Sequence, residues 1–147
     1  MKRESITFST EEVDMPAIDS ARVHAWLCQV AENHGLQIGR LNYVFCDDDT
    51  ILRVNREFLG HDYFTDIITF DYTRDAIASG DIYISLDTVA TNAELNSEAY
   101  SRELHRVIAH GLLHLCGIDD KGAGQREIME RHEDQALALL ETLNTDF

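Results

Sequence analysis

The segment formed by residues 98–116 constrains the fold more than any other part of the chain. Its apolar side chains lie on nearly every side of a helix: Leu104, Val107, Ile108, Leu112, Leu113 and Leu115. A helix that is apolar all round is a buried helix, so we predict a central helix with the rest of the chain packed around it. Ser97 is a suitable N-cap for this helix, and Gly117 is a suitable residue to end it.

Strand-like and helix-like patterns alternate along the rest of the chain. The predicted strands are residues 6–10, 41–46, 66–70 and 81–85. The other predicted helices are residues 21–34, a helix that carries 51–58 and ends at Gly60, a short helix from about 87 to 95, and about 125–143. Their expected caps are Asp19 or Ser20, residues 47–50, and Asp87. We therefore expect residues 1–147 to form a single α+β domain, with a mixed sheet of about four strands surrounded by about five helices.

The composition indicates the compartment in which the chain works. Its 147 residues are 44% hydrophobic, which is enough for a core that needs no disulfides. The three cysteines form no C-x-x-C pair, so free thiols in a reducing cytosol are expected. No run approaches the ~18 apolar residues of a membrane helix, and the N-terminus lacks the apolar centre of a secretory signal. We expect a cytoplasmic protein with no membrane partner.

Acidic residues dominate the charge of the chain. Asp and Glu number 27 against 12 Lys and Arg, which gives a net charge of −15. Such a chain repels polyanions, so nucleic-acid binding by simple charge attraction is disfavoured. Binding of RNA would have to depend on a local cleft, on base stacking, or on a partner that brings the RNA close.

Two histidines inside the buried segment need an explanation, because burial of polar groups is costly. His110 and His114 are four residues apart and therefore share one helical face, where two imidazole nitrogens can reach one ion. The chain can fold back after Gly117 and supply Asp120 as a third ligand, and Asp119 is equally available by composition. Three protein ligands with an open position describe a catalytic zinc site. The alternative is two unrelated core histidines.

The same spacing occurs in zinc proteases, where the motif is H-E-x-x-H. The glutamate of that motif is the general base of the protease. This chain has Gly111 at the equivalent position, so the base would have to come from elsewhere. A protease function is therefore disfavoured.

Residues 110–119, with the sequence HGLLHLCGID, resemble the H-G-x-L-H-L-x-G-[YI]-D signature of the YbeY family of bacterial metal-dependent endoribonucleases. Two further blocks carry the resemblance: residues 55–70, above all TDIITF at 65–70, and GDIYIS at 80–85. Met129 falls where the last helix of the family usually has a methionine. The resemblance extends from about residue 41 to about residue 140.

The resemblance implies one Zn²⁺ ion, a mixed sheet with surrounding helices, and a single-stranded RNA substrate in the cytoplasm. By position, His110 and His114 correspond to the first two ligands of the family. The third family ligand is usually a histidine, and Asp120 occupies its position. A carboxylate is a normal zinc ligand, but its negative charge should weaken the Lewis acid and raise the pKa of a bound water.

One departure from the family pattern concerns catalysis. The arginine that follows N-x-x-[YF] in the family is usually taken as catalytic or phosphate-contacting, and here it is Leu59. Arg53 and Arg56 on the preceding helix could compensate, although both fit an ordinary solvated face. Arg56 and Asp119 are the catalytic candidates, and Arg126 on the last helix is expected to lie far away.

Four other residues are candidates for lesser roles near the cleft. His61 lies in a loop close to the expected site. Glu103 is seven residues before His110, on the same helical face, and either orients a ligand or is a surface residue. Thr65 and Asp66 are expected to fix the turn into a strand.

Three functions are compatible with these features. The leading hypothesis is a zinc-dependent hydrolase that cleaves single-stranded RNA during maturation of the small-subunit ribosomal RNA 3′ end and in ribosome quality control. Its partners would be ribosomal RNA and the ribosome or ribosome-associated proteins. The second hypothesis is a ribosome-assembly factor with a mainly structural metal and little nuclease activity. The third is a metal-dependent hydrolase of another substrate.

Overall fold

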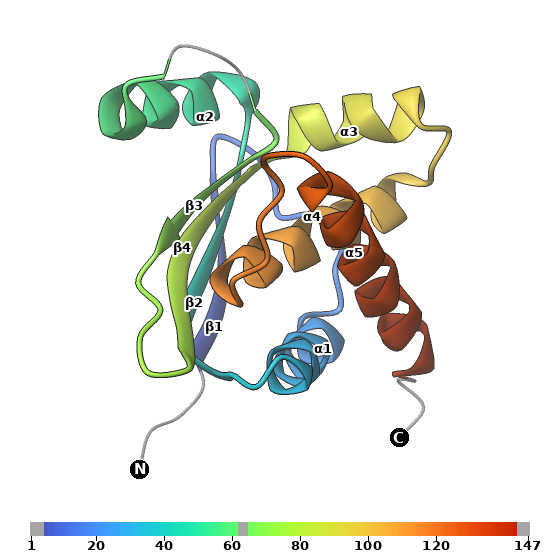
Figure 1. The fold of residues 1–147 in the computed structure, drawn as a ribbon. Helices are drawn as coiled ribbons and strands as arrows, with labels where there is room; N and C mark the ends of the chain where they lie inside the picture. The colour runs from blue at the N-terminus through green and yellow to red at the C-terminus, as the bar shows by residue number, and fades with distance from the viewer. Residues whose placement is uncertain (1–4, 62–64, 144–147) are drawn as a thin grey trace.

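The computed structural model describes residues 5–61 and 65–143, which form a mixed four-stranded sheet and its helices (Figure 1). The strands are β1 (Ser5–Glu11), β2 (Gln37–Cys46), β3 (Ile67–Asp71) and β4 (Ile77–Ser85), in the sheet order β1-β2-β4-β3. β1, β2 and β4 are parallel, and β3 pairs antiparallel with β4 at one edge. The predicted α+β class and mixed sheet are confirmed.

The helices are α1 (Ser20–Asn33), α2 (Asp48–Val54), α3 (Leu86–Leu95), α4 (Tyr100–Leu115) and α5 (Gln125–Thr142). A π-helical turn, η1 (Asn55–Leu59), continues α2 and ends at Gly60 in the left-handed conformation. Two predicted caps are confirmed, because the Asp19 and Asp47 carboxylates accept backbone N–H groups at the starts of α1 and α2. None of the described helices is long and apolar enough to cross a membrane.

Two other predicted caps are wrong. The Ser85 hydroxyl, and not Asp87, caps α3 by accepting the Thr88 N–H at 3.3 Å. Asp87 instead accepts the backbone N–H of Asp48 at 3.0 Å. Ser97 has a positive φ of 54° in the turn before α4 and cannot take the extended backbone of an N-cap. The cap position of α4 is Ala99.

The predicted central buried helix is confirmed as α4. Together with α1 and α5 it lies on one face of the sheet (Figure 1), and their apolar side chains form the main core. Tyr43 on β2 donates its hydroxyl hydrogen to the Ile108 carbonyl at 2.8 Å, and the Trp26 indole N–H donates to the Ala136 carbonyl at 2.7 Å. The opposite face has a smaller apolar cluster under α2, so the helices cover the sheet unequally.

Gly111 allows α4 to lie close against the sheet. A Cβ at this position would lie 2.9 Å from Cδ1 of Ile82 and 3.1 Å from Cδ1 of Ile67. A side chain at this position would have to displace the Ile82 and Ile67 side chains, so the glutamate of the zinc-protease motif would disturb this packing. The glycine therefore serves packing, and it sets the distance between the two histidines and β3.

We expect Gly111→Ala to destabilise the protein by about 1–3 kcal/mol, because the new methyl group overpacks the contact between helix and sheet. The opposing effect is helix propensity, which favours alanine by about 1 kcal/mol at an exposed helical position. Urea unfolding followed by circular dichroism measures the difference. A higher free energy of unfolding in the variant would contradict the close packing.

Candidate metal centre and cleft

The last two turns of α4 present His110 and His114 side by side. Their ring centroids are 4.7 Å apart, and the rings are inclined at 77°. Gly117, with φ of 94°, ends the helical run, and the chain turns back to begin α5 at Gln125. The chain reversal predicted from the glycine is therefore present.

The returning loop places Asp120 against both histidines. Oδ2 of Asp120 lies 3.3 Å from Nε2 of His110, and Oδ1 lies 3.5 Å from Nε2 of His114. One ligand atom from each of the three residues can be chosen so that all lie within 4.8 Å of one another. Two imidazole nitrogens and one carboxylate oxygen are a donor set that suits Zn²⁺. The three predicted ligands are thus brought together in a group that could hold a metal ion.

Asp119 shapes the loop that presents Asp120. Its Oδ1 accepts the backbone N–H groups of Asp120 at 2.7 Å and Lys121 at 3.1 Å, and these hydrogen bonds lower the pKa of Asp119. Asp119 is not part of the three-residue group that could hold an ion. Of the two carboxylates that composition left open, the geometry favours Asp120. A catalytic role for Asp119 stays a prediction.

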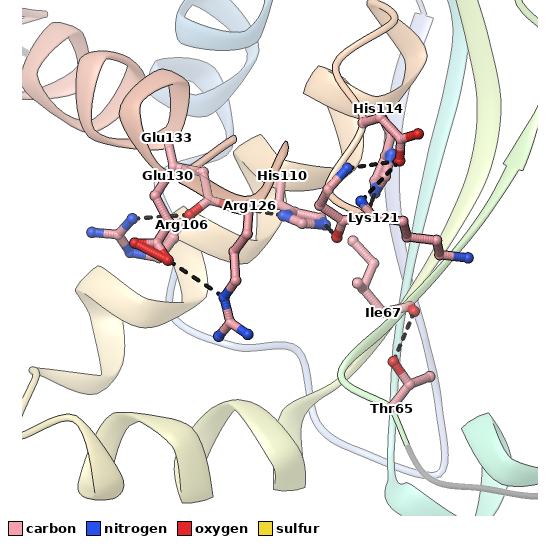
Figure 2. A network of polar contacts seen from close by, with 11 residues as sticks. Thr65, Ile67, Arg106, His110, His114, Lys121, Arg126, Glu130 and Glu133 are labelled. Carbon is pink, nitrogen blue, oxygen red and sulfur yellow. Dashed lines mark hydrogen bonds and ion pairs between the residues drawn. The ribbon is translucent and has the colours of Figure 1, made fainter. Parts of the chain in front are cut away.

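Glu133 on α5 holds the far side of the His110 ring. Nδ1–H of His110 donates to Oε2 of Glu133 at 2.6 Å, which leaves Nε2 directed at Asp120 (Figure 2). Burial by itself would lower the pKa of His110, but the hydrogen bond and charge of Glu133 raise it above its usual value. A carboxylate behind a ligating histidine fixes its tautomer and orientation. Glu133 was not predicted from the sequence.

Arg106 completes the support of Glu133. It lies one helical turn before His110, and its guanidinium donates to Oε1 of Glu133 and to Oδ1 of Asp134, each at 2.9 Å. The side chain of Glu133 is only 8% exposed, so this charged pair is largely removed from water. These contacts link Asp134, Arg106, Glu133 and His110 in series, so they tie α4 to α5. They lie behind the group formed by His110, His114 and Asp120, which we call the metal group.

The metal group opens into a cleft of about 1030 Å³ between β3, α3, α4 and α5. Its acidic lining residues are Asp66, Asp71, Glu98, Glu103, Asp120, Glu130, Glu133 and Asp134. Its Lys and Arg residues, among those described, are Arg106, Lys121 and Arg126. Carboxylates outnumber bases here as in the whole chain, so the cleft does not supply a general attraction for a polyanion.

The predicted arginines are placed differently from expectation. Arg126 lines the cleft, whereas we expected it to be distant, because the short return after Gly117 brings the start of α5 back over α4 (Figure 2). Leu59 also lines the cleft. Arg56 is exposed on η1 and is not among the lining residues, and Arg53 lies 3.6 Å from a carboxylate oxygen of Glu11.

The lesser candidates also reach the cleft. His61, Thr65 and Asp66 line it. The Thr65 hydroxyl donates to the Ile67 carbonyl at 3.3 Å, and the Asp66 carbonyl accepts the Ser85 N–H at 2.9 Å, so these residues fix the entry into β3 as predicted. Burial raises the pKa of Asp66, while the charge of His110 opposes that rise. Glu103 is buried, and the carboxylate that contacts a histidine is Glu133 instead.

Comparison with known proteins gives relatives over nearly the whole chain. A family model described as "Endoribonuclease YbeY" matches residues 5–141. Proteins of that name from Parabacteroides distasonis and Phocaeicola vulgatus are 55% and 56% identical to this chain, over 92% of it and 96% and 98% of their own lengths. The solution structure of TM1509 from Thermotoga maritima shares the fold, with a TM-score of 0.66 at 23% identity, covering 92% of this chain and 88% of that one.

Proposed function

Because the chain belongs to the YbeY family, we propose that it is a metal-dependent endoribonuclease that cleaves single-stranded RNA. Its single Zn²⁺ ion would be held by His110, His114 and Asp120. In the cell it would act in the cytoplasm on ribosomal RNA, in maturation of the small-subunit 3′ end and in ribosome quality control, together with the ribosome or ribosome-associated proteins.

The observation that carries this proposal is the position of the metal group at the open cleft. His110 and His114 are 17% and 27% exposed and Asp120 is 29% exposed, so the ion would be reachable from the cleft. A structural zinc site is closed by four protein ligands, whereas a catalytic one keeps a position open. Among the described residues only three ligating side chains converge here.

The chain's own residues would orient the ion and the RNA. Glu133 fixes the His110 ring through Nδ1, and the Asp119 turn presents Asp120. Among the described basic residues of the cleft, Arg126 and Lys121 do not contact Glu133. Arg126 lies 3.5 Å from Glu130 in an exposed ion pair, and both cations could contact phosphate oxygens. When bound, the ion would supply Lewis-acid stabilisation and lower the pKa of a water in the cleft.

The proposal is tested by measuring metal content and RNA cleavage on the same preparation. We expect one zinc per chain, cleavage of a single-stranded RNA but not of its duplex, loss of cleavage with a chelator, and recovery when zinc is restored. Cleavage that is unchanged after complete removal of metal would contradict the proposal. Equal cleavage of the duplex would contradict its single-strand part.

Leu59 leaves the cleft without the arginine of the family, and restoring it should increase the rate. Leu59 is 42% exposed and lines the cleft, so a guanidinium fits there without entering the core. We expect Leu59→Arg to raise kcat/KM about tenfold, because one added donor near the phosphoryl oxygens stabilises developing charge. Tyr72→Arg adds the same charge at an exposed position outside the cleft lining and is the control. Equal rates in both variants would contradict a role for this position.

The native arginines can be ranked by their positions. Arg126 lines the cleft and Arg56 does not, so we expect Arg126→Ala to reduce cleavage more than Arg56→Ala, which reverses the order predicted from the sequence. Initial rates on one RNA at saturating zinc measure both. A larger loss in Arg56→Ala would mean that η1 approaches the RNA.

A second candidate function is ribosome assembly with a mainly structural metal. The excess of carboxylates in the cleft and Leu59 at the arginine position favour it. It requires that zinc stabilise the protein while cleavage stays slow on every single-stranded RNA. Ribosome cosedimentation of a variant without nuclease activity, compared with the wild type, separates binding from cleavage.

A further inference from the structure

Glu103 is a largely buried residue whose carboxylate faces the cleft and accepts no hydrogen bond from the described residues. The residue is 7% exposed and is one of the cleft-lining residues. Within the described part of the chain, no side chain or backbone group donates to its carboxylate. Neither carboxylate oxygen is closed off from the cleft, because among the described residues only Nδ1 of His132 is both fully buried and unpartnered. A carboxylate with so little contact with water gains from a further donor, so Glu103 can accept one from a ligand in the cleft.

Arg106, the basic residue whose charge acts on Glu103, already contacts two other carboxylates. Arg106 lies three residues after Glu103, and its two terminal nitrogens donate to Glu133 and Asp134. Burial raises the pKa of Glu103. The charge of Arg106 lowers this pKa, but it offsets the effect of burial only in part. The carboxylate remains available to a donor that enters from the cleft.

The cleft that Glu103 lines also has apolar and amide groups. Val107, four residues after Glu103 on α4, contributes an apolar surface, and α3, which packs on α4, contributes Asn92 and Leu95, with Asn96 at its C-cap. Leu95 is 76% exposed. This lining also holds the Glu103 carboxylate and the acidic groups whose charges act on it, Asp66, Glu98 and Glu133. An apolar surface beside amides and carboxylates suits a flat, uncharged heteroaromatic ring that carries N–H donors. Seven residues separate Glu103 from His110, which is about 10.5 Å along a helix.

The ligand group that contacts Glu103 is more readily a neutral N–H donor than a metal cation or a phosphate. Glu103 does not belong to a group of three ligating side chains; among the described residues, only His110, His114 and Asp120 do. A phosphate would be repelled by Glu103 and by the nearby Asp66 and Glu133, whose charges also act on Glu103. A neutral donor avoids both difficulties, and the bases of RNA carry such donors.

Guanine offers the best match among the four bases. Its Watson–Crick edge carries N1–H and N2–H side by side, so both oxygens of one carboxylate can accept at once. Adenine and cytosine present a single amino group and uracil a single N–H. Only guanine therefore satisfies both oxygens of a carboxylate by a bidentate contact.

We propose that Glu103 is a specificity-determining residue that accepts N1–H and N2–H of a guanine base near the scissile phosphate, displaced from the metal group along α4. This proposal rests on the proposed endoribonuclease function. The enzyme should then cleave single-stranded RNA preferentially at a fixed spacing from guanosine.

The test uses short oligouridines that carry one guanosine, inosine or adenosine at the same position. Inosine lacks only the N2 amino group, so it removes one of the two donors without changing the protein. We expect wild-type kcat/KM to fall about tenfold from guanosine to inosine, within the range of one bidentate contact. Glu103→Gln should cleave the guanosine RNA as slowly as wild type cleaves the inosine RNA, and should cleave the inosine RNA with little further loss.

Glu94→Gln is the matched control, because Glu94 is exposed on α3 and does not line the cleft. Zinc content and melting temperature of Glu103→Gln should equal those of the wild type.

Equal cleavage of the guanosine and inosine RNAs by the wild type, or a guanosine preference that persists in Glu103→Gln, would overturn the assignment and leave the nuclease function standing. Loss of a second Mn²⁺-binding event in Glu103→Gln, with no change in base preference, would overturn it in favour of a cation. No cleavage of any RNA by zinc-loaded wild type would reject the proposed function and this assignment with it.

Discussion

His114→Ala should yield a protein that retains little zinc and cleaves RNA at least about a thousandfold more slowly than the wild type. His114 would supply one of three ligands, and the two that remain, His110 and Asp120, cannot complete the site. A bound ion supplies several kcal/mol of transition-state stabilisation, which corresponds to this loss of rate. Zinc per chain by elemental analysis and initial rates on one single-stranded RNA measure the two effects.

The same variant should also melt at a lower temperature. The ion would tie the end of α4 to the loop that carries Asp120, and a ligand present at a hundred times its Kd stabilises the folded state by about 2.7 kcal/mol. His105→Ala is the control for the zinc effect, because His105 lies on α4 but does not line the cleft. Loss of its ring contact with Trp26 lowers the melting temperature by itself, but the rise in melting temperature on adding zinc should equal that of the wild type. A metal-depleted wild type with an unchanged melting temperature would show that the ion does not hold this loop.

Most of the fold could be predicted from local pattern, because the helices carry their own signals. The all-round apolar character of 98–116 gave α4 its central place, and the Asp19 and Asp47 carboxylates form the expected caps. The errors arose where the path of the backbone decides. Ser97 has the composition of a cap, but it follows the end of α3 in a left-handed turn.

Strand limits were underestimated for a similar reason. β2 begins at Gln37 and β4 at Ile77, both earlier than predicted, because the two strands pair with each other beyond their most apolar stretches. Strand propensity is largely a matter of the partner strand and of burial. A glycine such as Gly80 lowers the local signal, yet its place in β4 keeps room for the Phe70 carbonyl, which would lie 2.6 Å from a Cβ there.

Some residues of the candidate site could be predicted from one short stretch of sequence, whereas others come together only through the packing of distant segments. His110, His114 and Asp120 lie within one short stretch, so their spacing sufficed to bring them together in prediction. Glu133 and Arg106 meet only because α5 packs on α4. A signal for Glu133 does exist: it shares the buried stripe of α5 with apolar residues. Such a charged residue on an apolar stripe needs a partner.

Glu133→Gln should weaken zinc binding by about 10- to 100-fold while leaving the three ligating side chains in place. The amide can still accept the Nδ1–H of His110, but it loses the negative charge that makes the imidazole a stronger ligand and fixes its tautomer. It also removes one of the two carboxylates that Arg106 contacts at 2.9 Å and leaves Asp134 as the other. Competition with a chromogenic chelator measures the change in Kd.

The effect of Glu133→Gln on cleavage should depend on zinc, and this distinguishes a positioning residue from a ligand. At saturating zinc the variant should recover most of its rate, whereas His114→Ala should not, because it lacks a ligand at any zinc concentration. Glu127→Gln removes an exposed carboxylate from the first turn of the same helix and should leave the Kd unchanged. If Glu133→Gln bound zinc as tightly as the wild type, the hydrogen bond to His110 would serve only to pack α5 on α4. If its rate stayed low at saturating zinc, Glu133 would act in cleavage itself and not through His110.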